Sequence, residues 1–299
     1  MQEAVLITNL AAEATSPRVK EVIVKALSSD LRLEVVDTAA PGHATTLASE
    51  AARNGCELVV AFGGDGTMNE VANGLVGSDT PLAILPGGNT NVVCRNLGLP
   101  ADIVGAIGHL LNGLRHRETR RISVGRTGGR CFLISCGAGL RAPVNGQSHP
   151  SGGRFPGRHL LESALHAAVR DRRGREPLMH LSAGDVSYDV VVAFISNTPQ
   201  PAYVMGWPVT LAPEARLEEG LDVLAMRHLP LSYVPRLAWS SLAGGSHTRY
   251  KQAVYLHDLG SVRLCSSGPP FPVHLDGEFL EDRTEVEVEI IRDGLAVLV

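Results

Sequence analysis

A strand that runs into a glycine-rich loop and then a helix is the feature that most constrains this sequence. Leu58–Phe62 is an uninterrupted apolar run, Gly63-Gly64-Asp65-Gly66-Thr67 follows at once, and Met68–Leu75 has the pattern of a helix. Three glycines within four residues let the backbone approach a ligand closely and permit positive φ angles. The following helix offers free N–H groups and a positive dipole end to phosphate. The segment therefore predicts an anion-binding loop.

Apolar runs and helix-like segments alternate through the first third of the chain. The expected strands are 4–8, 31–36, 58–62 and 82–85, and the expected helices are 17–27, 44–53, 68–75, 92–97 and 103–111. Such alternation is typical of a parallel sheet with crossover helices. Ligands bind at the carboxyl ends of the strands in such sheets, so we place the functional site there.

Strands dominate after the charged stretch Arg115–Arg121. They are expected at 122–125, 130–135, 180–183, 186–196, 209–212 and 221–228, with a loop at 146–157 and a helix at 159–172. Between Glu285 and Ile290, glutamates alternate with valine and isoleucine, as in a strand with one wet face. The predicted fold is an α/β domain at 1–120, a mostly antiparallel β-rich domain at 121–289, and a terminal strand at 290–299 that returns to the first domain.

Composition excludes several classes of protein. The 299 residues are 44% hydrophobic and carry a formal net charge of −4, which gives no field that would attract nucleic acid. The five cysteines form no CxxC pair, which argues against a zinc site or a disulfide framework and favours a cytoplasmic location. No apolar stretch is as long as a membrane span, so we expect no transmembrane segment. The histidines show no metal-binding spacing.

Known phosphate-binding motifs fit this loop poorly, because neither G-x-G-x-x-G nor G-x-x-x-x-G-K-[ST] is present. The segment Gly63–Glu70, which reads GGDGTMNE, instead resembles that of diacylglycerol kinases, sphingosine kinases and bacterial lipid kinases. A second block, Leu85–Pro100, is similar to the family's proline-glycine loop. A third, Leu275-Asp276-Gly277-Glu278, is similar to its DGE motif.

The resemblance implies a two-domain kinase with the acceptor site in the cleft between the domains. Glu278 would be the proton acceptor, with Asp276 close to the same hydroxyl. Phosphoryl transfer needs such a carboxylate, because an alcohol must lose its proton as it attacks the γ-phosphorus. On its own, Asp276-Gly277 would be interpreted as a hairpin turn. The residues that the resemblance assigns to ATP are Asn9, Thr38, Gly63, Gly64, Asp65, Gly66, Thr67, Met68, Asn69, Glu70, Gly88 and Asn89. Because a bare carboxylate repels phosphate, we expect Asp65 to orient the loop or to act through magnesium.

Several positions depart from the family pattern. The usual Asn-Pro-x-x-Gly after the first strand retains only its asparagine, Asn9. Asn89 replaces a threonine, Val92 replaces an aspartate, and Arg141 replaces another aspartate on the acceptor side. Near Gly220 the chain resembles the segment that holds a structural magnesium, with Glu219 in place of aspartate. The resemblance implies metal ligands at Arg216, Glu219 and Leu221.

The sequence thus predicts a cytoplasmic, ATP-dependent and Mg²⁺-dependent lipid kinase. It would take a diacylglycerol-like or sphingoid lipid from a membrane surface, with transient membrane association and without nucleic acid as a partner. Arginines between Arg154 and Arg175 are best interpreted as a solvated helix face. One alternative is a kinase of NAD or another polar alcohol, and a second is a non-catalytic nucleotide or lipid sensor. Whether the chain forms a homodimer stays open.

Overall fold

The computed structural model describes residues 2–12, 15–116, 118–139, 179–204 and 206–299. Two compact units make up the chain. Unit 1 comprises Met1–Val124 and Arg292–Val299, and unit 2 comprises Gly125–Ile291. The predicted loop at 146–157, the predicted helix at 159–172 and Arg141 lie outside the described residues.

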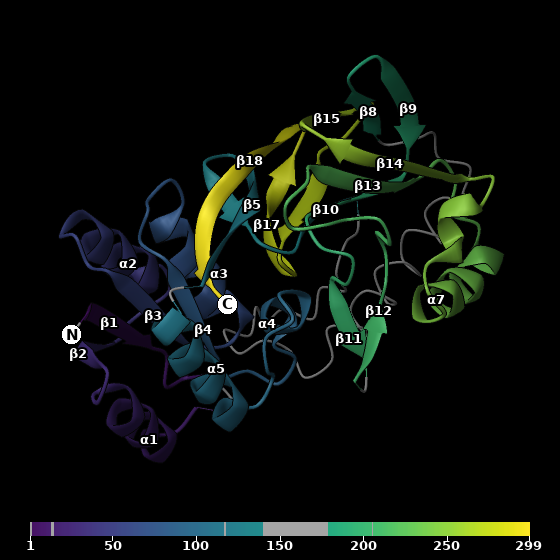
Figure 1. The fold of residues 1–299 in the computed structure, drawn as a ribbon. Coiled ribbons are helices and arrows are strands. Elements are labelled where there is room, and N and C mark those ends of the chain that lie inside the picture. The colour runs from purple at the N-terminus through teal and green to yellow at the C-terminus, as the bar shows by residue number, and fades with distance from the viewer. Residues whose placement is uncertain (1, 13–14, 117, 140–178, 205) are drawn as a thin grey trace. The chain divides into compact units, whose positions relative to one another are not determined.

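Unit 1 is built on a parallel sheet (Figure 1). Its strands are β1 (Gln2–Thr8), β2 (Leu31–Asp37), β3 (Leu58–Gly63), β4 (Leu82–Pro86) and the end of β18 (Glu285–Leu298), in the order β2-β1-β3-β4-β18. Thr8 lies opposite both Asp37 and Phe62, and Gly63 lies opposite Pro86. The carboxyl ends of the first four strands therefore meet at one edge of the sheet.

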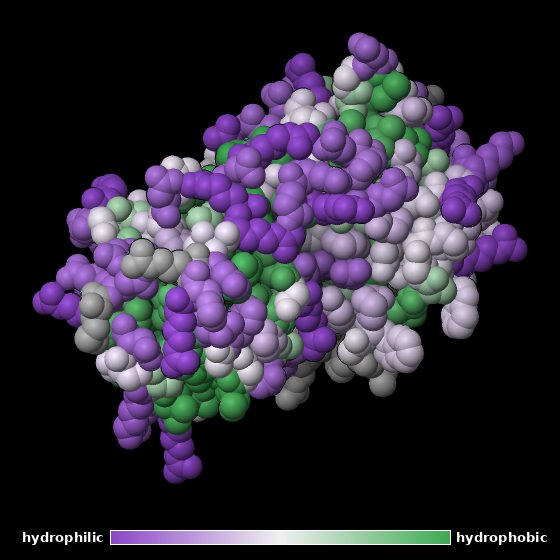
Figure 2. All heavy atoms as spheres, in the orientation of Figure 1, coloured by the Kyte–Doolittle hydropathy of each residue, from purple (hydrophilic) through white to green (hydrophobic). Residues whose placement is uncertain are grey.

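Helices cover both faces of this sheet, which explains why its strands β3 and β4 are buried throughout. They are α1 (Pro17–Leu27), α2 (His43–Arg53), α3 (Asp65–Leu75), α4 (Val92–Asn96) and α5 (Ile103–His116). Ile23 of α1 and Leu110 of α5 join a buried cluster with Leu6, Val60 and Leu85 from alternate strand positions. In Figure 1, α2 and α3 lie on the other side of the sheet. On the face drawn in Figure 2, hydrophobic atoms gather where Figure 1 places α5.

Unit 2 contains two sheets of mostly antiparallel strands. The larger one comprises β7 (Ser135–Ala138), β10 (Val192–Ser196), β13 (Leu221–Met226), β14 (Ala253–Leu259), β16 (Phe271–Leu275) and β17 (Glu278–Arg283), in the order β14-β13-β10-β7-β16-β17. The other comprises β8 (Met179–Ala183), β9 (Val186–Val190), β15 (Ser261–Ser266) and the first part of β18. Strand β5 (Thr119–Thr127) pairs with β18 and also with β6 (Arg130–Phe132). Cys136, Val223 and Val273 of the larger sheet share one buried cluster with Leu264 and Val288 of the other, so the sheets pack face to face.

Small elements complete unit 2. They are the hairpin β11 (Ala202–Val204) and β12 (Trp207–Val209), the helix α7 (Val234–Leu242), and the 3₁₀ turns η1 (Leu231–Tyr233) and η2 (Ser246–Arg249). The predicted fold class, a parallel α/β sheet followed by an antiparallel β-rich region, is confirmed.

Some predicted boundaries are wrong. The expected strand 186–196 is two strands, β9 and β10, that join different sheets, and the expected strand 130–135 divides into β6 and β7. Of the expected strand 209–212 only Val209 is in a strand, because Thr210 instead donates its N–H to the carbonyl of Ser241 in α7 at 2.8 Å. Helix α3 begins at Asp65 rather than Met68. The first helical turn therefore lies within the glycine loop itself.

Candidate active site

The glycine loop between β3 and α3 exposes a helix N-terminus at the carboxyl edge of the unit 1 sheet. Gly64 is the residue before the first helical turn and has no side chain to cap it. The first intrahelical bond from this region is donated by Met68 to the carbonyl of Gly64, at 3.1 Å. The N–H groups of Asp65, Gly66 and Thr67 precede that bond and have no intrahelical acceptor. Together with the helix dipole they suit a phosphate group.

A second glycine loop, after β4, packs directly on the first. Gly87 donates its N–H to the carbonyl of Gly63 at 2.7 Å. A Cβ at Gly87 would lie 3.0 Å from the Gly63 Cα and 2.6 Å from the Thr15 Cγ2, and a Cβ at Gly88 would lie 3.0 Å from the Gly64 Cα. Such distances leave no room for a side chain, so the glycines are required for the two backbones to meet.

Asp65 fastens these loops together. One carboxylate oxygen accepts the N–H of Val93 at 3.0 Å and the other accepts the Thr90 hydroxyl at 3.2 Å, which ties the start of α3 to the start of α4. Burial raises the pKa of Asp65, while hydrogen bonds from the Val93 and Val92 backbone and from Thr90 act in the opposite direction. Both oxygens of Asp65 are thus engaged within the protein, and the two roles expected for this residue stay predictions.

Asn91 and Asn9 add further links. Asn91 adopts a left-handed backbone conformation at φ +44° and accepts the Gly88 N–H on its side-chain oxygen at 3.0 Å. Asn9 donates from its side-chain nitrogen to the Thr67 hydroxyl at 3.0 Å, which joins the end of β1 to the first turn of α3. The sequence did not single out Asn91. An asparagine immediately before a predicted helix was the available signal.

The other predicted ATP contacts have mixed surroundings. Thr38 donates its N–H to the carbonyl of Thr8 at 2.8 Å and so lies at the same sheet edge. Met68 is buried in the core, and Glu70 accepts the Ala44 N–H at 3.2 Å, at the start of α2. Asn69 accepts from Asn73 at 3.0 Å, whereas Gly66 and Asn89 are exposed. The structure brings together Asn9, Thr38, Gly63, Gly64, Asp65, Gly66, Thr67 and Gly88, and it gives Met68 and Glu70 packing roles.

Val92, at the position of the family's aspartate, is 4% exposed. A carboxylate there would be buried, so its absence fits the local packing. A basic side chain lies at the same sheet edge instead, because Lys20 of α1 contacts the Asp37 carboxylate at 2.6 Å. The hydrogen bond from Lys20 lowers the pKa of Asp37, and one from Thr8 adds to this effect.

The DGE segment forms a two-residue hairpin turn between β16 and β17 in unit 2. Leu275 pairs with Glu278, and both Asp276 (φ +48°) and Gly277 (φ +86°) have positive φ angles, as a type I′ turn requires. The hairpin interpretation of Asp276-Gly277 is therefore correct for the backbone. It does not decide the role of the side chains.

The Asp276 carboxylate accepts hydrogen bonds from three backbone N–H groups. Leu133 donates to one oxygen at 3.0 Å, and Ile134 and Ser135 both donate to the other at 2.9 Å. In return, Asp276 donates its own N–H to the carbonyl of Ser135 at 2.9 Å. A carboxylate held in this way positions the turn. Glu278, the first residue of β17, is exposed, and its role as proton acceptor stays a prediction.

In the segment near Gly220, where a structural magnesium is expected, the Glu219 carboxylate lies close to two side-chain nitrogen atoms. One Glu219 oxygen lies 3.8 Å from the Arg216 Nε and the other lies 3.4 Å from the His257 Nε2, so both face nitrogen atoms. His257 also contacts the buried Asp222 at 2.8 Å. Within the described ranges, no group of three or more His, Cys, Asp or Glu residues is placed to hold a metal ion. One oxygen of Glu219, Oε2, is buried and makes no hydrogen bond within the described residues. The ligand set Arg216, Glu219 and Leu221, which includes backbone carbonyls, stays a prediction.

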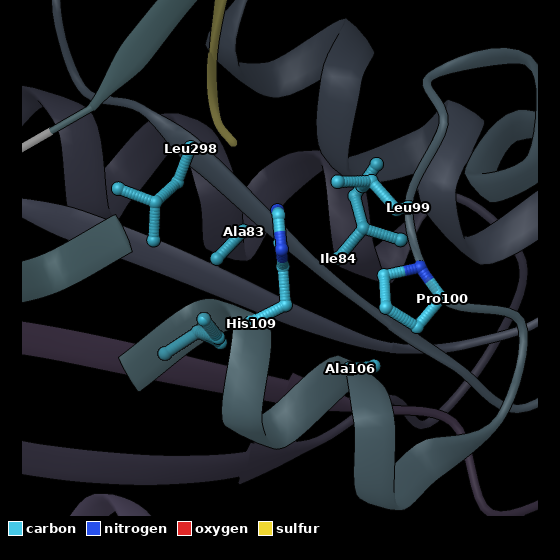
Figure 3. A pocket seen from close by; sticks show the side chains of 8 residues that line it. Ala83, Ile84, Leu99, Pro100, Ala106, His109 and Leu298 are labelled. Carbon is cyan, nitrogen blue, oxygen red and sulfur yellow. The ribbon is translucent and has the colours of Figure 1, made fainter. Parts of the chain in front are cut away.

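A separate pocket in unit 1 lies between α5 and β4. Figure 3 shows His109 rising from α5 among Ala83, Ile84, Leu99, Pro100 and Leu298. The His109 Nε2 is buried without a hydrogen-bond partner. Because the remaining lining is apolar, this pocket does not suit phosphate.

Comparisons with known proteins agree with these motifs. Residues 3–127 match the model of the diacylglycerol kinase catalytic domain. A diacylglycerol kinase of Bacillus subtilis is 29% identical over 255 residues, which cover 81% of this chain and 78% of the relative. One of Staphylococcus epidermidis is 28% identical over 253 residues, which cover 80% and 73%.

Solved structures give the same fold. A crystal structure described as a diacylglycerol kinase from Bacillus anthracis has a TM-score of 0.73 at 19% identity and covers 99% of this chain and 96% of its own. Yeast NADH kinase has a TM-score of 0.53 at 11% identity and covers 100% and 83%. At these identities the likeness establishes the architecture alone.

Proposed function

We propose that the protein is an ATP-dependent lipid kinase, because residues 3–127 match the model of the diacylglycerol kinase catalytic domain. It transfers the γ-phosphoryl group of ATP to the hydroxyl of a diacylglycerol-like or sphingoid lipid. The observation that carries the proposal is the pair of glycine loops fastened by Asp65, with the free N–H groups of the first turn of α3 beside them. That arrangement suits bound phosphate groups.

Each group in the proposed site has one task. The α3 N-terminus and the second glycine loop bind the phosphates; Asn9 ties the end of β1 to the first turn of α3, and Asn91 braces the second loop at Gly88. Glu278 takes the proton as the lipid hydroxyl oxygen bonds to the γ-phosphorus and the bond to ADP breaks. Asp276 fixes the turn that presents Glu278. Magnesium, which enters with the nucleotide and needs few protein ligands, neutralises phosphate charge.

Two matched variants test the role of Glu278. Glu278 and Glu281 are both exposed glutamates of β17, and Glu281 pairs with Arg283. We expect Glu278→Gln to lower kcat by about 10²–10⁴-fold while ATP binding persists, because one general base contributes about that much. Glu281→Gln should keep the wild-type rate. If the two variants retain equal activity, Glu278 is not the base.

The acceptor is tested by product extraction. The protein is incubated with γ-labelled ATP, Mg²⁺ and, separately, diacylglycerol, a sphingoid base or NAD. We expect label in the organic phase with one of the two lipids. Label found as phosphorylated NAD would support the polar-alcohol kinase instead, and binding of ATP without any transfer would support the sensor.

A further inference from the structure

Both tryptophans of the chain lie on the surface of unit 2, on neighbouring elements. The sequence contains two, Trp207 in β12 and Trp239 in α7, and their exposed fractions are 69% and 75%. The hydrogen bond from Thr210 to the carbonyl of Ser241 holds the end of β12 to α7, and Figure 1 shows these elements side by side. Tryptophan is normally one of the most buried residues, so two exposed together need an explanation.

Packing against the protein core does not explain the exposed Trp239, because the inner face of α7 is already packed without it. Val234 and Leu237 join a buried cluster with Met226 and Leu229. On the outer side, Leu242 of α7 lies three residues after Trp239, about one helical turn away, and Leu231 of the preceding 3₁₀ turn η1 is exposed as well. We name Trp207, Leu231, Trp239 and Leu242 the tryptophan patch.

Basic residues border the tryptophan patch. Arg236 lies in α7 with its guanidinium over the Tyr233 ring, and Arg249 and Lys251 flank Tyr250, whose hydroxyl donates to the carbonyl of Arg236. No ion pair joins any of these three to a carboxylate in the part of the chain that the structure describes.

Acidic residues are absent from the sequence between Asp222 and Asp258, although the chain as a whole carries a net charge of −4. Glu214 follows Pro213, which lies beside Gly245, and bounds the basic rim there. Over the place of α7, Figure 2 shows atoms of intermediate hydropathy with strongly hydrophilic side chains projecting at the edge.

We propose that the tryptophan patch docks the protein on the surface of an anionic lipid bilayer. Tryptophan favours the boundary between hydrocarbon and headgroups, because its ring is apolar and its indole N–H seeks a polar partner. Arg236, Arg249 and Lys251 complement negative headgroups at the rim. The proposal rests on the proposed lipid-kinase function, since an enzyme of that kind must reach a substrate embedded in a membrane. No helix in the described residues is long and apolar enough to cross one.

The two tryptophans make the test direct, because the intrinsic tryptophan fluorescence of the protein comes from the tryptophan patch alone. The full chain is mixed with vesicles of phosphatidylcholine containing one third phosphatidylglycerol, with or without bromine on the acyl chains. We expect a blue shift and quenching by the brominated lipid, and little change with pure phosphatidylcholine. Absence of both effects with the anionic vesicles would overturn the proposal.

Variants give the magnitude. Trp239→Ser should weaken vesicle binding, measured by flotation, about tenfold, as expected from losing part of the buried indole area. Arg236→Gln should weaken it about fivefold. Val104→Ser and Lys25→Gln serve as controls, because both side chains are similarly exposed but lie in unit 1. Equal binding by all four variants would overturn the proposal.

Two further measurements distinguish lipid docking from self-association of the protein and from the kinase proposal. A fluorescence change that depends on protein concentration without vesicles, together with a dimer in sedimentation, would show that a second copy covers the tryptophan patch and would overturn lipid docking. Transfer to a short-chain diacylglycerol or a sphingoid base in solution, measured on the wild type without vesicles, tests the kinase proposal by itself. Vesicle binding without such transfer would support docking and count against the lipid kinase, and the reverse result would do the opposite.

Discussion

Replacing Asp276 distinguishes a residue that positions the turn from one that takes part in the chemistry. Its carboxylate accepts three backbone N–H groups, and its backbone is left-handed. In Asp276→Asn the amide oxygen can keep the bonds from Ile134 and Ser135, but the amide nitrogen then faces the N–H of Leu133. Asparagine also retains the preference for a type I′ turn. The variant therefore loses one bond and the charge on the others, at a cost of about 1–2 kcal/mol.

Asp276→Ala loses all three bonds and places alanine in a left-handed conformation. The total cost is about 4 kcal/mol, of which about 1 kcal/mol is backbone strain. For a domain of this size, Asp276→Asn should lower Tm by about 5 °C and Asp276→Ala by about 10 °C or more. Thermal unfolding followed by circular dichroism measures both values.

Kinetics complete the test. If Asp276 only positions the turn, Asp276→Asn should lower kcat by less than about tenfold, while Glu278→Gln lowers it by about 10²–10⁴-fold. The dependence of kcat on pH should also keep its wild-type shape in Asp276→Asn. A variant that melts within a few degrees of wild type and yet is as inactive as Glu278→Gln would refute this reasoning, because loss of position could not then explain loss of rate.

Three further predictions follow from the packing. Gly87→Ala places a Cβ 2.6 Å from the Thr15 Cγ2 and should cost about 1–3 kcal/mol and weaken ATP binding in calorimetry, whereas Gly108→Ala, which meets no atom within 4 Å, should not destabilise the chain. Asp65→Ala should weaken ATP binding about tenfold, because replacing a capping side chain by alanine costs about 1 kcal/mol or more, and an unchanged Kd would show that the loops do not need this tie. Burial lowers the pKa of His247 in the folded protein. As the pH decreases below about 6.5, His247 is therefore protonated more readily in the unfolded chain than in the folded one, and the free energy of unfolding should decrease. In denaturant titrations His247→Gln should flatten this dependence, and an identical slope in the variant would contradict the assignment.

Local signals predicted the elements of unit 1 well. The helix at 17–27 has the predicted bounds, because Ser16 caps it through the N–H of Val19 and Pro17 begins its first turn. The strands before the glycine loops were apolar on both faces, as buried parallel strands are. The glycine loops could also be predicted as a phosphate site, because the glycines that such a site requires are visible in the sequence itself.

Non-local pairing limited the predictions for unit 2. No glycine or proline marks Val191, where the chain leaves one sheet for the other between β9 and β10. Strands β14 to β16 and the helix α7 were not predicted at all, since their pairing and packing partners are distant in sequence. The Asp276 carboxylate accepts hydrogen bonds from the backbone N–H groups of Leu133, Ile134 and Ser135. These partners could not be predicted, because nearly every residue type has the same backbone N–H group.

The course of β18 has a consequence for how the protein is made. Val297 pairs with Leu82 of β4, so the sheet of unit 1 is completed by residues that follow all of unit 2 in the chain. At ordinary rates of synthesis, a ribosome needs roughly ten to thirty seconds to add unit 2. During that interval the edge of β4 lacks the strand that finally covers it, and an open edge invites pairing with other chains. The nascent first unit is therefore the stage at which a chaperone would matter most.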